Sequence, residues 1–354
     1  MREKRKRFRP LWQVLAADLL LTLLILGGWL LTRWVSVRRM ADTYRQEQLV
    51  SESAPPSSAA DPAAAPLTGP GTDAEQETAP QPDDRTPWQI KFAEHFTPEV
   101  RRGEWYYTGP DVSVCVTSHT YEGRKGVTVY YVADIYIADI EYLQSWFACG
   151  NSFPSTTESI ADMSRESGAL IAVNGDYCGL SYGGTVLRNG EPVYSAITGS
   201  DVCLLYRDGR MECPALTSFD EADYQGDDAL WQVWTFGPAL LDGNGRALSL
   251  TEMNRCSTSR SENPRTALGY YEPGHYCFIV ADGRDANYSA GLWLDEFAEV
   301  CALTGCAQAY NMDGGGSSMM VMDGEFVNRP SSGGRRGIPD IILIREPEDK
   351  EAGE

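Results

Sequence analysis

Histidine is scarce in this chain, with three residues in 354, and no C-x-x-C pair occurs among its nine cysteines. These shortages argue against a Ser-His-Asp triad, a histidine-based zinc site, a zinc ribbon and a thioredoxin-like redox site. Positive charge is also in the minority, because 30 Lys and Arg stand against 50 Asp and Glu, a formal net charge of -20. Such a chain repels phosphate backbones, so nucleic acid is not expected as a partner.

The few cations are concentrated at the start of the chain. Residues 1–40 carry nine Lys and Arg against Glu3 and Asp18, and residues 11–32 form an apolar run whose one charge is Asp18. A helix of roughly 20 residues spans the hydrocarbon core, and a cation excess before the span keeps that side cytoplasmic. The pattern predicts a cytoplasmic basic tail over 1–10 and a transmembrane helix over 11–32. It therefore predicts a single-pass protein of the cell membrane whose body is extracytoplasmic, with a cleaved signal peptide as the alternative.

A stretch without a core-forming composition follows. Residues 51–87 contain one leucine, Leu67, and no aromatic residue. Such a stretch cannot bury enough apolar surface to offset its ordering entropy. We therefore assign 33–87 to a juxtamembrane segment and disordered linker, 88–346 to one globular domain and 347–354 to an acidic tail.

Short apolar runs and two-residue turns dominate the body. Four Asn-Gly or Asp-Gly pairs predict tight hairpins, at 189–190, 208–209, 242–243 and 323–324. Four runs predict strands, at 127–140, 169–173, 277–281 and 338–344. One helix is expected from a cap at Ser289 to Gly305, and a second over 155–166. The fold class expected is α+β: a single sheet-rich domain with a mixed β-sheet and a few helices, tethered to the N-terminal transmembrane helix.

All nine cysteines lie in the part predicted to be exported. An odd number leaves at least one thiol free in an oxidising compartment. Cys203 and Cys213 flank the turn at 208–209, and only a three-residue loop would place them opposite each other. The sequence leaves that bridge open.

Four segments share one pattern, a short apolar run followed by a polar loop with glycine: 170–177, 263–269, 278–284 and 310–318. Loops of this kind at strand ends are typical of ligand sites. Any one Asp-Gly or Asn-Gly pair is better explained as an ordinary turn. Gly314, Gly315 and Gly316 exceed what a hairpin needs, and they suit a backbone that turns its N–H groups toward an anion.

The chemistry available in these loops is that of carboxylates and arginines. The candidates are Asp176, Asp282, Asp285 and Asp313 with Arg265, Arg284, Arg335 and Arg336. Carboxylates at an anomeric carbon and arginines on a phosphate would suit a sugar-phosphate substrate.

These motifs resemble the phosphodiester glycosidase family. The resemblance is carried by AVNGDY at 172–177, NPRTALGY at 263–270, VADGR at 280–284, NMDGGGSSMM at 311–320 and R-x-x-P at 336–339, and it covers roughly residues 112–345. Family members commonly have Asn-Gly-Gly-Phe-Phe where this chain has Asn-Gly-Asp-Tyr-Cys at 174–178. The resemblance implies cleavage of a sugar-1-phosphodiester at its glycosidic C–O bond, releasing the sugar and a phosphomonoester.

The residue inventory agrees with this chemistry, because a phosphomonoester leaving group has a second pKa of about 6 and needs no strong general acid. We assign catalytic roles to Asp313, Asp282 and Asp176. We assign substrate contacts to Asn174, Arg265, Thr266, Arg284, Asn311, Gly314, Gly315, Gly316, Ser317 and Arg336. The sequence makes no cofactor certain. The oxygen donors are compatible with a divalent cation, Ca²⁺ or Mg²⁺, but nothing in the spacing identifies metal ligands.

Three functions remain open. The first is a membrane-anchored phosphodiester glycosidase acting on cell-envelope or exopolysaccharide glycans. The second is a non-catalytic module that binds glycans or assists envelope assembly, and the third is an ordinary glycoside hydrolase with two carboxylates. The number of charged groups in the loops favours the first over the second.

Overall fold

The computed structural model describes residues 85–150, 156–178, 185–194, 201–214, 229–253 and 260–347, which belong to one compact unit, residues 81–354. The predicted cytoplasmic tail and transmembrane segment, with nearly all of the linker and the acidic tail, lie outside these residues. Among the helices of the described part, none is long and apolar enough to cross a bilayer.

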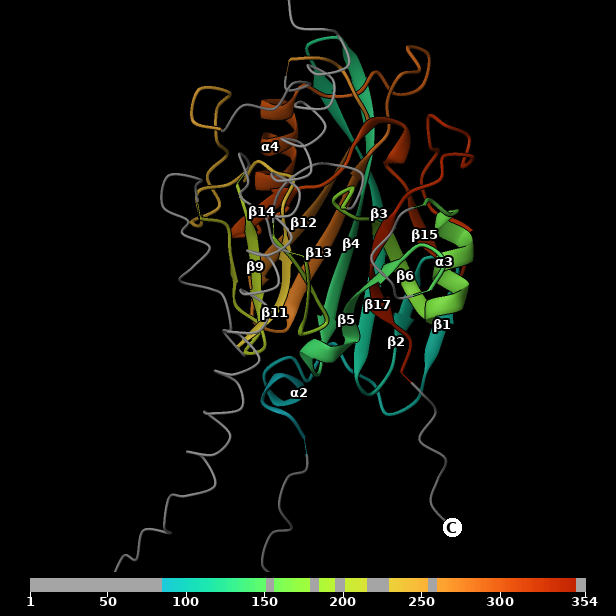
Figure 1. The fold of residues 1–354 in the computed structure, drawn as a ribbon, viewed down its shortest axis with the longest axis vertical. Coiled ribbons are helices and arrows are strands. Elements are labelled where there is room, and N and C mark those ends of the chain that lie inside the picture. The colour runs from blue at the N-terminus through green and yellow to red at the C-terminus, as the bar shows by residue number, and fades with distance from the viewer. Residues whose placement is uncertain are drawn as a thin grey trace, which may run out of the picture. The chain divides into compact units, whose positions relative to one another are not determined.

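Three sheets make up the body (Figure 1). The first has the order β1 (Arg101–Gly103), β2 (Tyr106–Thr108), β3 (Val112–Gly123), β4 (Gly126–Ile137), β13 (His275–Ala281), β12 (Arg265–Glu272), β14 (Gln308–Asn311). The second is β10 (Met211–Glu212), β9 (Cys203–Tyr206), β11 (Leu230–Trp234), β7 (Val186–Arg188), β8 (Glu191–Tyr194). The third is β16 (Glu325–Phe326), β15 (Met320–Met322), β6 (Ala169–Asn174), β17 (Asp340–Arg345), β5 (Leu143–Phe147).

Strand pairing corrects one prediction. Every pairing between the described strands is antiparallel, so the prediction of a mixed sheet was wrong. Parallel neighbours need crossover connections of a dozen or more residues, whereas tight turns join many of these strands. Three of the four predicted Asn-Gly or Asp-Gly hairpins are confirmed, between β7 and β8, β9 and β10, and β15 and β16. The fourth, at 242–243, is a loop closed by one bridge between Leu241 and Ala247.

Buried strands explain the continuous apolar runs of the sequence. Along β13, Tyr276, Phe278 and Val280 pack into the core cluster that all three sheets share, and the alternate residues pack beneath α4 (Leu294–Leu303). Along β17, Ile342 and Ile344 join the same shared core, while the alternate residues pack beneath α3 (Ile160–Ser167). A strand covered on both faces has no polar side, so its sequence lacks alternation.

The predicted bounds agree better with the structure for one of the two longer helices than for the other. Ser159 caps α3 by accepting from Asp162 N at 3.1 Å, and Gly168 ends it at φ +67°, so this helix is confirmed with a later start. The predicted cap at Ser289 was wrong, because α4 begins after Trp293. Ser289 instead accepts from Val129 N at 3.0 Å, and Ala290 N donates to Val127 O at 2.9 Å, so this segment extends along β4.

A short helix, α2 (Pro87–Lys91), begins the described body close to the predicted domain start. Its Trp88 ring lies against the glycines of two turns, Gly209 between β9 and β10 and Gly274 between β12 and β13. A Cβ atom at either glycine would lie within 3.0 Å of that ring, and both glycines have positive φ. The start of the body is therefore wedged between turns of two different sheets. Two 3-10 helices, η1 (Ile140–Tyr142) and η3 (Gly315–Ser317), complete the described elements.

All eight cysteines among the described residues are free thiols, which confirms that at least one is left unpaired. The register of β9 and β10 pairs Glu212 with Leu204, so Cys213 and Cys203 would be the next pair. They approach each other closely enough to hydrogen-bond, but they form no bridge.

Candidate active site

The polar loops singled out in the sequence meet at one edge of the sheets. In the seven-stranded sheet Arg265 pairs with Ala281 and Ala267 with Asn311, so the start of β12 lies beside the ends of β13 and β14. The end of β6, from another sheet, joins them through the segment that follows β14. Asn174 Nδ2 donates to Asp313 O at 2.6 Å, and Asp313 N donates to Gly175 O at 3.2 Å.

Four neutral polar residues predicted to bind substrate are buried, and the first three tie these loops together: Asn174, Thr266, Asn311 and Ser317. Asn174 Oδ1 accepts from Thr266 Oγ1 at 2.8 Å and from Met319 N at 3.3 Å. Asn311 Nδ2 donates to Gly237 O at 2.8 Å. Their side chains are at most 2% exposed, so this geometry favours support of the site over contact with a ligand.

The glycine-rich loop after β14 needs its glycines for close approach. Gly315 has φ +65°, and a Cβ atom there would lie 2.7 Å from the Arg284 guanidinium. Gly315 N also donates to Pro264 O at 2.9 Å, which fixes the loop against the start of β12. The loop is thus held between two neighbouring segments, as expected where backbone must approach another group closely.

Two exposed arginines flank this loop. The Arg284 guanidinium lies over Gly315, and the Arg336 side chain passes within 3.6 Å of the Cβ position at Gly316. Neither arginine has a carboxylate within ion-pair distance in the described ranges. In a chain of net charge -20, two exposed and unpaired guanidinium groups at one loop form a site suited to an anion.

Asp313 begins this loop and lies within electrostatic reach of Arg336. Burial raises the pKa of the Asp313 carboxyl, and the neighbouring Ser317 hydroxyl, the hydrogen bond from Gly314 N and the charge of Arg336 oppose that shift. Asp313 Oδ1 accepts from Gly314 N at 2.8 Å, so the residue also caps its own turn. Asp313, Gly314–316, Ser317, Arg284 and Arg336 are therefore the predicted site residues that the structure brings together around one surface loop.

Asp282 has both carboxylate oxygens in hydrogen bonds. Oδ1 accepts from Asn328 Nδ2 at 2.7 Å, and Oδ2 accepts from Tyr288 Oη and from Arg329 N, each at 3.0 Å. Burial nevertheless raises the pKa of Asp282. Asn328 Nδ2 also donates to Ser318 O at 3.2 Å, which couples Asp282 to the end of the glycine-rich loop. Sequence reasoning missed Asn328, although it follows the apolar run after a predicted hairpin.

Asp176 lies in a buried charge cluster instead of the surface loop. Arg188 Nη2 contacts Asp176 Oδ1 at 2.8 Å and Asp340 Oδ2 at 3.6 Å, and all three side chains are at most 2% exposed. Asp176, Cys178 and Asp340 bring three ligand atoms within 4.8 Å of one another, the spacing of a metal site. The Arg188 guanidinium already supplies the positive charge there, so an ion pair accounts for the cluster. No sequence pattern pointed to Arg188 or Asp340, which lie in runs interpreted only as a hairpin and a strand.

Arg265 is buried and turned toward carbonyl groups. Its Nε donates to Leu292 O and its Nη2 to Ser261 O, each at 3.0 Å, and the residue is 2% exposed. This arrangement favours a role in joining two loops over the phosphate contact predicted for it.

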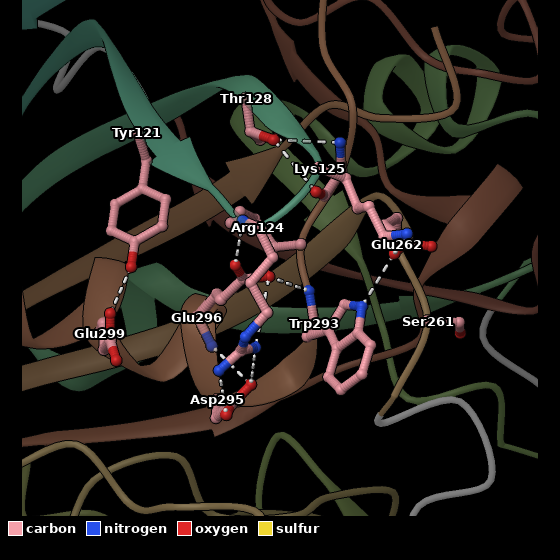
Figure 2. Close-up of polar contacts among 12 residues, drawn as sticks. Tyr121, Arg124, Lys125, Thr128, Ser261, Glu262, Trp293, Asp295, Glu296 and Glu299 are labelled. Atoms are coloured by element: carbon pink, nitrogen blue, oxygen red, sulfur yellow. Dashed lines mark hydrogen bonds and ion pairs between the residues drawn. The ribbon is translucent and has the colours of Figure 1, made fainter. Parts of the chain in front are cut away.

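A polar clasp joins the turn between β3 and β4 to the start of α4 and to Glu262 (Figure 2). Arg124, in the turn between β3 and β4, donates to both carboxylate oxygens of Asp295 at 2.7 and 2.8 Å and stacks on Trp293. Glu296 accepts from Arg124 N at 2.6 Å and from Trp293 N at 2.8 Å. Trp293 Nε1 then donates to Glu262 at 3.0 Å. The clasp thus fixes the segment that leads into Arg265.

Comparison with known proteins adds a family. Residues 167–345 match the family described as phosphodiester glycosidase. The chain is 26% identical over 242 residues to the SPbeta prophage-derived protein YomE of Bacillus subtilis, covering 66% of this chain and 36% of that protein. It is 25% identical over 219 residues to bovine N-acetylglucosamine-1-phosphodiester alpha-N-acetylglucosaminidase, covering 56% of this chain and 40% of that protein.

One solved structure has the same fold. It is the catalytic domain of the zebrafish N-acetylglucosamine-1-phosphodiester alpha-N-acetylglucosaminidase, auto-inhibited by its pro-peptide. It matches with a TM-score of 0.56 at 18% identity, covering 70% of this chain and 88% of that one. The chain spans 36% and 40% of the two curated relatives above, so their whole-protein properties do not transfer to it directly.

Proposed function

From the premise that this chain belongs to the phosphodiester glycosidase family, a family of hydrolases, we propose that it hydrolyses the glycosidic bond of a sugar-1-phosphodiester. The products are the free sugar and a phosphomonoester. The observation that carries this proposal is the surface loop of Asp313 and Gly314–316, flanked by the unpaired guanidinium groups of Arg284 and Arg336. It combines one carboxylate with an anion site, as this substrate requires.

The mechanism assigns the reacting carboxylate to Asp313. An anionic side chain at the anomeric carbon stabilises the developing oxocarbenium ion or activates the attacking water. Arg284, Arg336 and the backbone N–H groups of the loop stabilise the charge that the phosphate gains as the C–O bond breaks. Water supplies the oxygen and one proton of the new sugar hydroxyl, and its other proton goes to the phosphomonoester or the solvent.

Asp282 has a positioning role in this scheme. Three donors already occupy its two oxygens, and one of them, Asn328, reaches the glycine-rich loop. The same hydrogen bonds argue against an ordinary two-carboxylate glycosidase, because they occupy the oxygens of Asp282, the candidate second carboxylate. We propose further that the protein is anchored in the membrane by residues 11–32 and acts on cell-envelope or exopolysaccharide glycans.

The test is hydrolysis of methyl diesters of α- and β-linked sugar 1-phosphates by the full chain in H₂¹⁸O. Glycosidic cleavage places ¹⁸O in the sugar and releases unlabelled methyl phosphate, which ³¹P NMR and mass spectrometry identify. Label in the phosphate would show P–O cleavage and contradict the proposal. Binding without turnover would indicate a non-catalytic module, and hydrolysis of neutral glycosides would indicate an ordinary glycosidase. A parallel reaction with a chelator shows whether Ca²⁺ or Mg²⁺ takes part.

A further inference from the structure

Arg284 is held in an unusual way. Its backbone has φ +67°, a left-handed conformation that a side chain such as arginine rarely adopts. Its Nε and Nη2 donate to the same oxygen, Asn263 Oδ1, at 3.2 and 2.7 Å. Nη1 has no hydrogen-bond partner among the described residues and remains available at the glycine-rich loop.

Asn263 is itself fixed before it meets Arg284. Its backbone exchanges two hydrogen bonds with Leu292, with N···O distances of 3.3 and 3.0 Å. Its Nδ2 donates to Ser261 Oγ at 2.7 Å, which turns the amide oxygen toward Arg284. The preceding residue, Glu262, belongs to the clasp described above. The amide oxygen of Asn263 is therefore a preorganised acceptor. It is already in place to receive the hydrogen bonds from Arg284.

An amide as partner distinguishes Arg284 from the arginines of this acidic body that pair with carboxylates. Seven described arginines form ion pairs with carboxylates: Arg102, Arg124, Arg165, Arg188, Arg210, Arg246 and Arg329. A carboxylate at position 263 would bind the guanidinium as a bidentate ion pair and compensate its charge. Asparagine is nearly the same shape and leaves the charge intact.

We propose that Asn263 is a positioning residue that orients Arg284 without neutralising it, and that it thereby sets the preference of this site for a phosphate over a neutral group. This inference rests on the proposed function for its substrate. The interaction it predicts, between Arg284 and a phosphomonoester, can be measured without turnover.

The experiment compares Asn263→Asp, Asn263→Ala and Arg284→Ala with the wild-type full chain. We measure KM and kcat for the methyl phosphodiester, the Kd of methyl phosphate by titration calorimetry, and Tm. Asn263→Asp should raise both KM and the Kd of methyl phosphate by about tenfold or more, the loss of one charge-assisted contact, with kcat changing much less and Tm unchanged or higher. Asn263→Ala removes the orientation but keeps the charge, so its effect should be smaller.

Two controls separate local contact from general charge and from misfolding. Asn244→Asp adds the same charge in an exposed loop beside the start of β14, whereas the site loop follows the end of β14, and it should leave KM and Kd unchanged. Adding Arg284→Ala to Asn263→Asp should produce little further loss, because the two changes remove one interaction.

Three results would overturn the inference: wild-type Kd for methyl phosphate in Asn263→Asp, an equal or larger effect of Asn263→Ala, or no binding of methyl phosphate by the wild type. If the wild type binds methyl phosphate but hydrolyses no diester, the proposed function fails while the role of Asn263 is still decided by the Kd values.

Discussion

The ionised form of Asp313, which the proposed reaction needs, is the form that burial disfavours in the folded protein. Burial raises the pKa of its carboxyl, so the folded protein holds the ionised form at a cost in free energy that the unfolded chain does not bear. The proposed reaction needs that ionised form. A residue kept in a destabilising state is a common feature of functional sites.

Asp313→Asn should therefore lower kcat by about a hundredfold or more while leaving Tm unchanged or raised. The amide keeps an acceptor oxygen for Gly314 N, so the turn itself should survive. Diester hydrolysis and thermal melting measured on the same samples provide the test. Turnover close to that of the wild type would remove Asp313 from the catalytic set and leave it as a turn cap.

The raised pKa also predicts two pH dependences. The acid limb of kcat/KM should lie above the ordinary aspartate pKa of about 3.9, because activity is lost as Asp313 takes up a proton. For stability the sign is reversed. The folded state binds this proton more tightly than the unfolded chain, so the contribution is present at low pH and is lost as the pH rises through the raised folded pKa. The Tm advantage of Asp313→Asn over the wild type should thus grow from acid to neutral pH, and a constant difference would contradict the assignment.

The buried cluster makes a separate prediction. Burial and the neighbouring Asp176 raise the pKa of Asp340 well above its usual range, which favours its neutral form, and Arg188 lies closer to Asp176 (2.8 Å) than to Asp340 (3.6 Å). Asp340→Asn should change the free energy of unfolding by about 1 kcal/mol or less, since an amide is also neutral. Asp176→Asn with Asp340→Asn should cost about 3–5 kcal/mol, because Arg188 is then buried without a counter-charge. Chemical denaturation of the three proteins checks this, and a double variant as stable as the single one would refute it.

Residue patterns in the sequence located the surface loop but did not give its partners. Asp313, Arg284 and Arg336 belong to motifs that close apolar runs, and strand ends converge at sheet edges. The partners of Asp282 and Asp176 depend on strand order, which no local pattern encodes. Asp176 and Asp340 are 164 residues apart and meet only because β6 and β17 are neighbours. The catalytic and binding roles assigned to these residues stay predictions.

At the scale of elements, β12 contains a glycine, Gly269, because the neighbouring strands leave no room for a side chain there. Gly269 pairs with Cys277 of β13 on one side and with Ala309 of β14 on the other. A Cβ atom at Gly269 would lie 2.5 Å from Cys277 Sγ and 3.3 Å from Cys306 Sγ. The hydrogen bond between these thiols, together with burial, raises the pKa of Cys277. The missing side chain leaves the space in which the two thiols meet.

Gly269→Ala should therefore destabilise the domain by about 1–3 kcal/mol, the usual cost of overpacking, although alanine is the better strand residue in isolation. Adding Cys277→Ala should recover part of that loss by removing the colliding sulfur. Denaturant midpoints of the wild type, both single variants and the double variant test the pair. Additive effects would show that Cys277 is not the obstacle.

Secondary structure was predicted correctly where β-branched and aromatic residues dominated a run. It was predicted wrongly where a segment could form hydrogen bonds either within a helix or with a neighbouring strand. The β-branched and aromatic runs of β4, β13 and β17 predicted strands. Ser289 was predicted to cap a helix. Its hydroxyl instead accepts a hydrogen bond from Val129 N, and the segment runs along β4. A serine ahead of an apolar run is compatible with a helix cap, but the local sequence does not show that a strand distant in sequence can donate to the same hydroxyl.

At the scale of the whole molecule, the prediction that remains is topological. If residues 11–32 span the membrane with residues 1–10 in the cytoplasm, protease added to intact cells should cut between 51 and 87 and release a soluble body. Immunoblotting of the medium for an epitope in the 88–346 domain measures this. Lysed cells provide the control for cleavage, and a body protected until lysis would contradict the orientation.

The wedge of Trp88 has a mechanical consequence. Tension applied to the chain ahead of residue 86 would enter the folded body at Thr86, whose Oγ1 donates to Ala138 O at 2.9 Å, and at the turns around Gly209 and Gly274. Gly274 lies at the end of β12 and β13 that is remote from Arg265 and Ala281, where the loops of the site begin. Tyr276 Oη also donates to Gly209 O at 2.7 Å, so the two turns share the load. A pull on the leading segment would thus be absorbed by the far ends of the strands, and the loop of Asp313 would keep its geometry under strain.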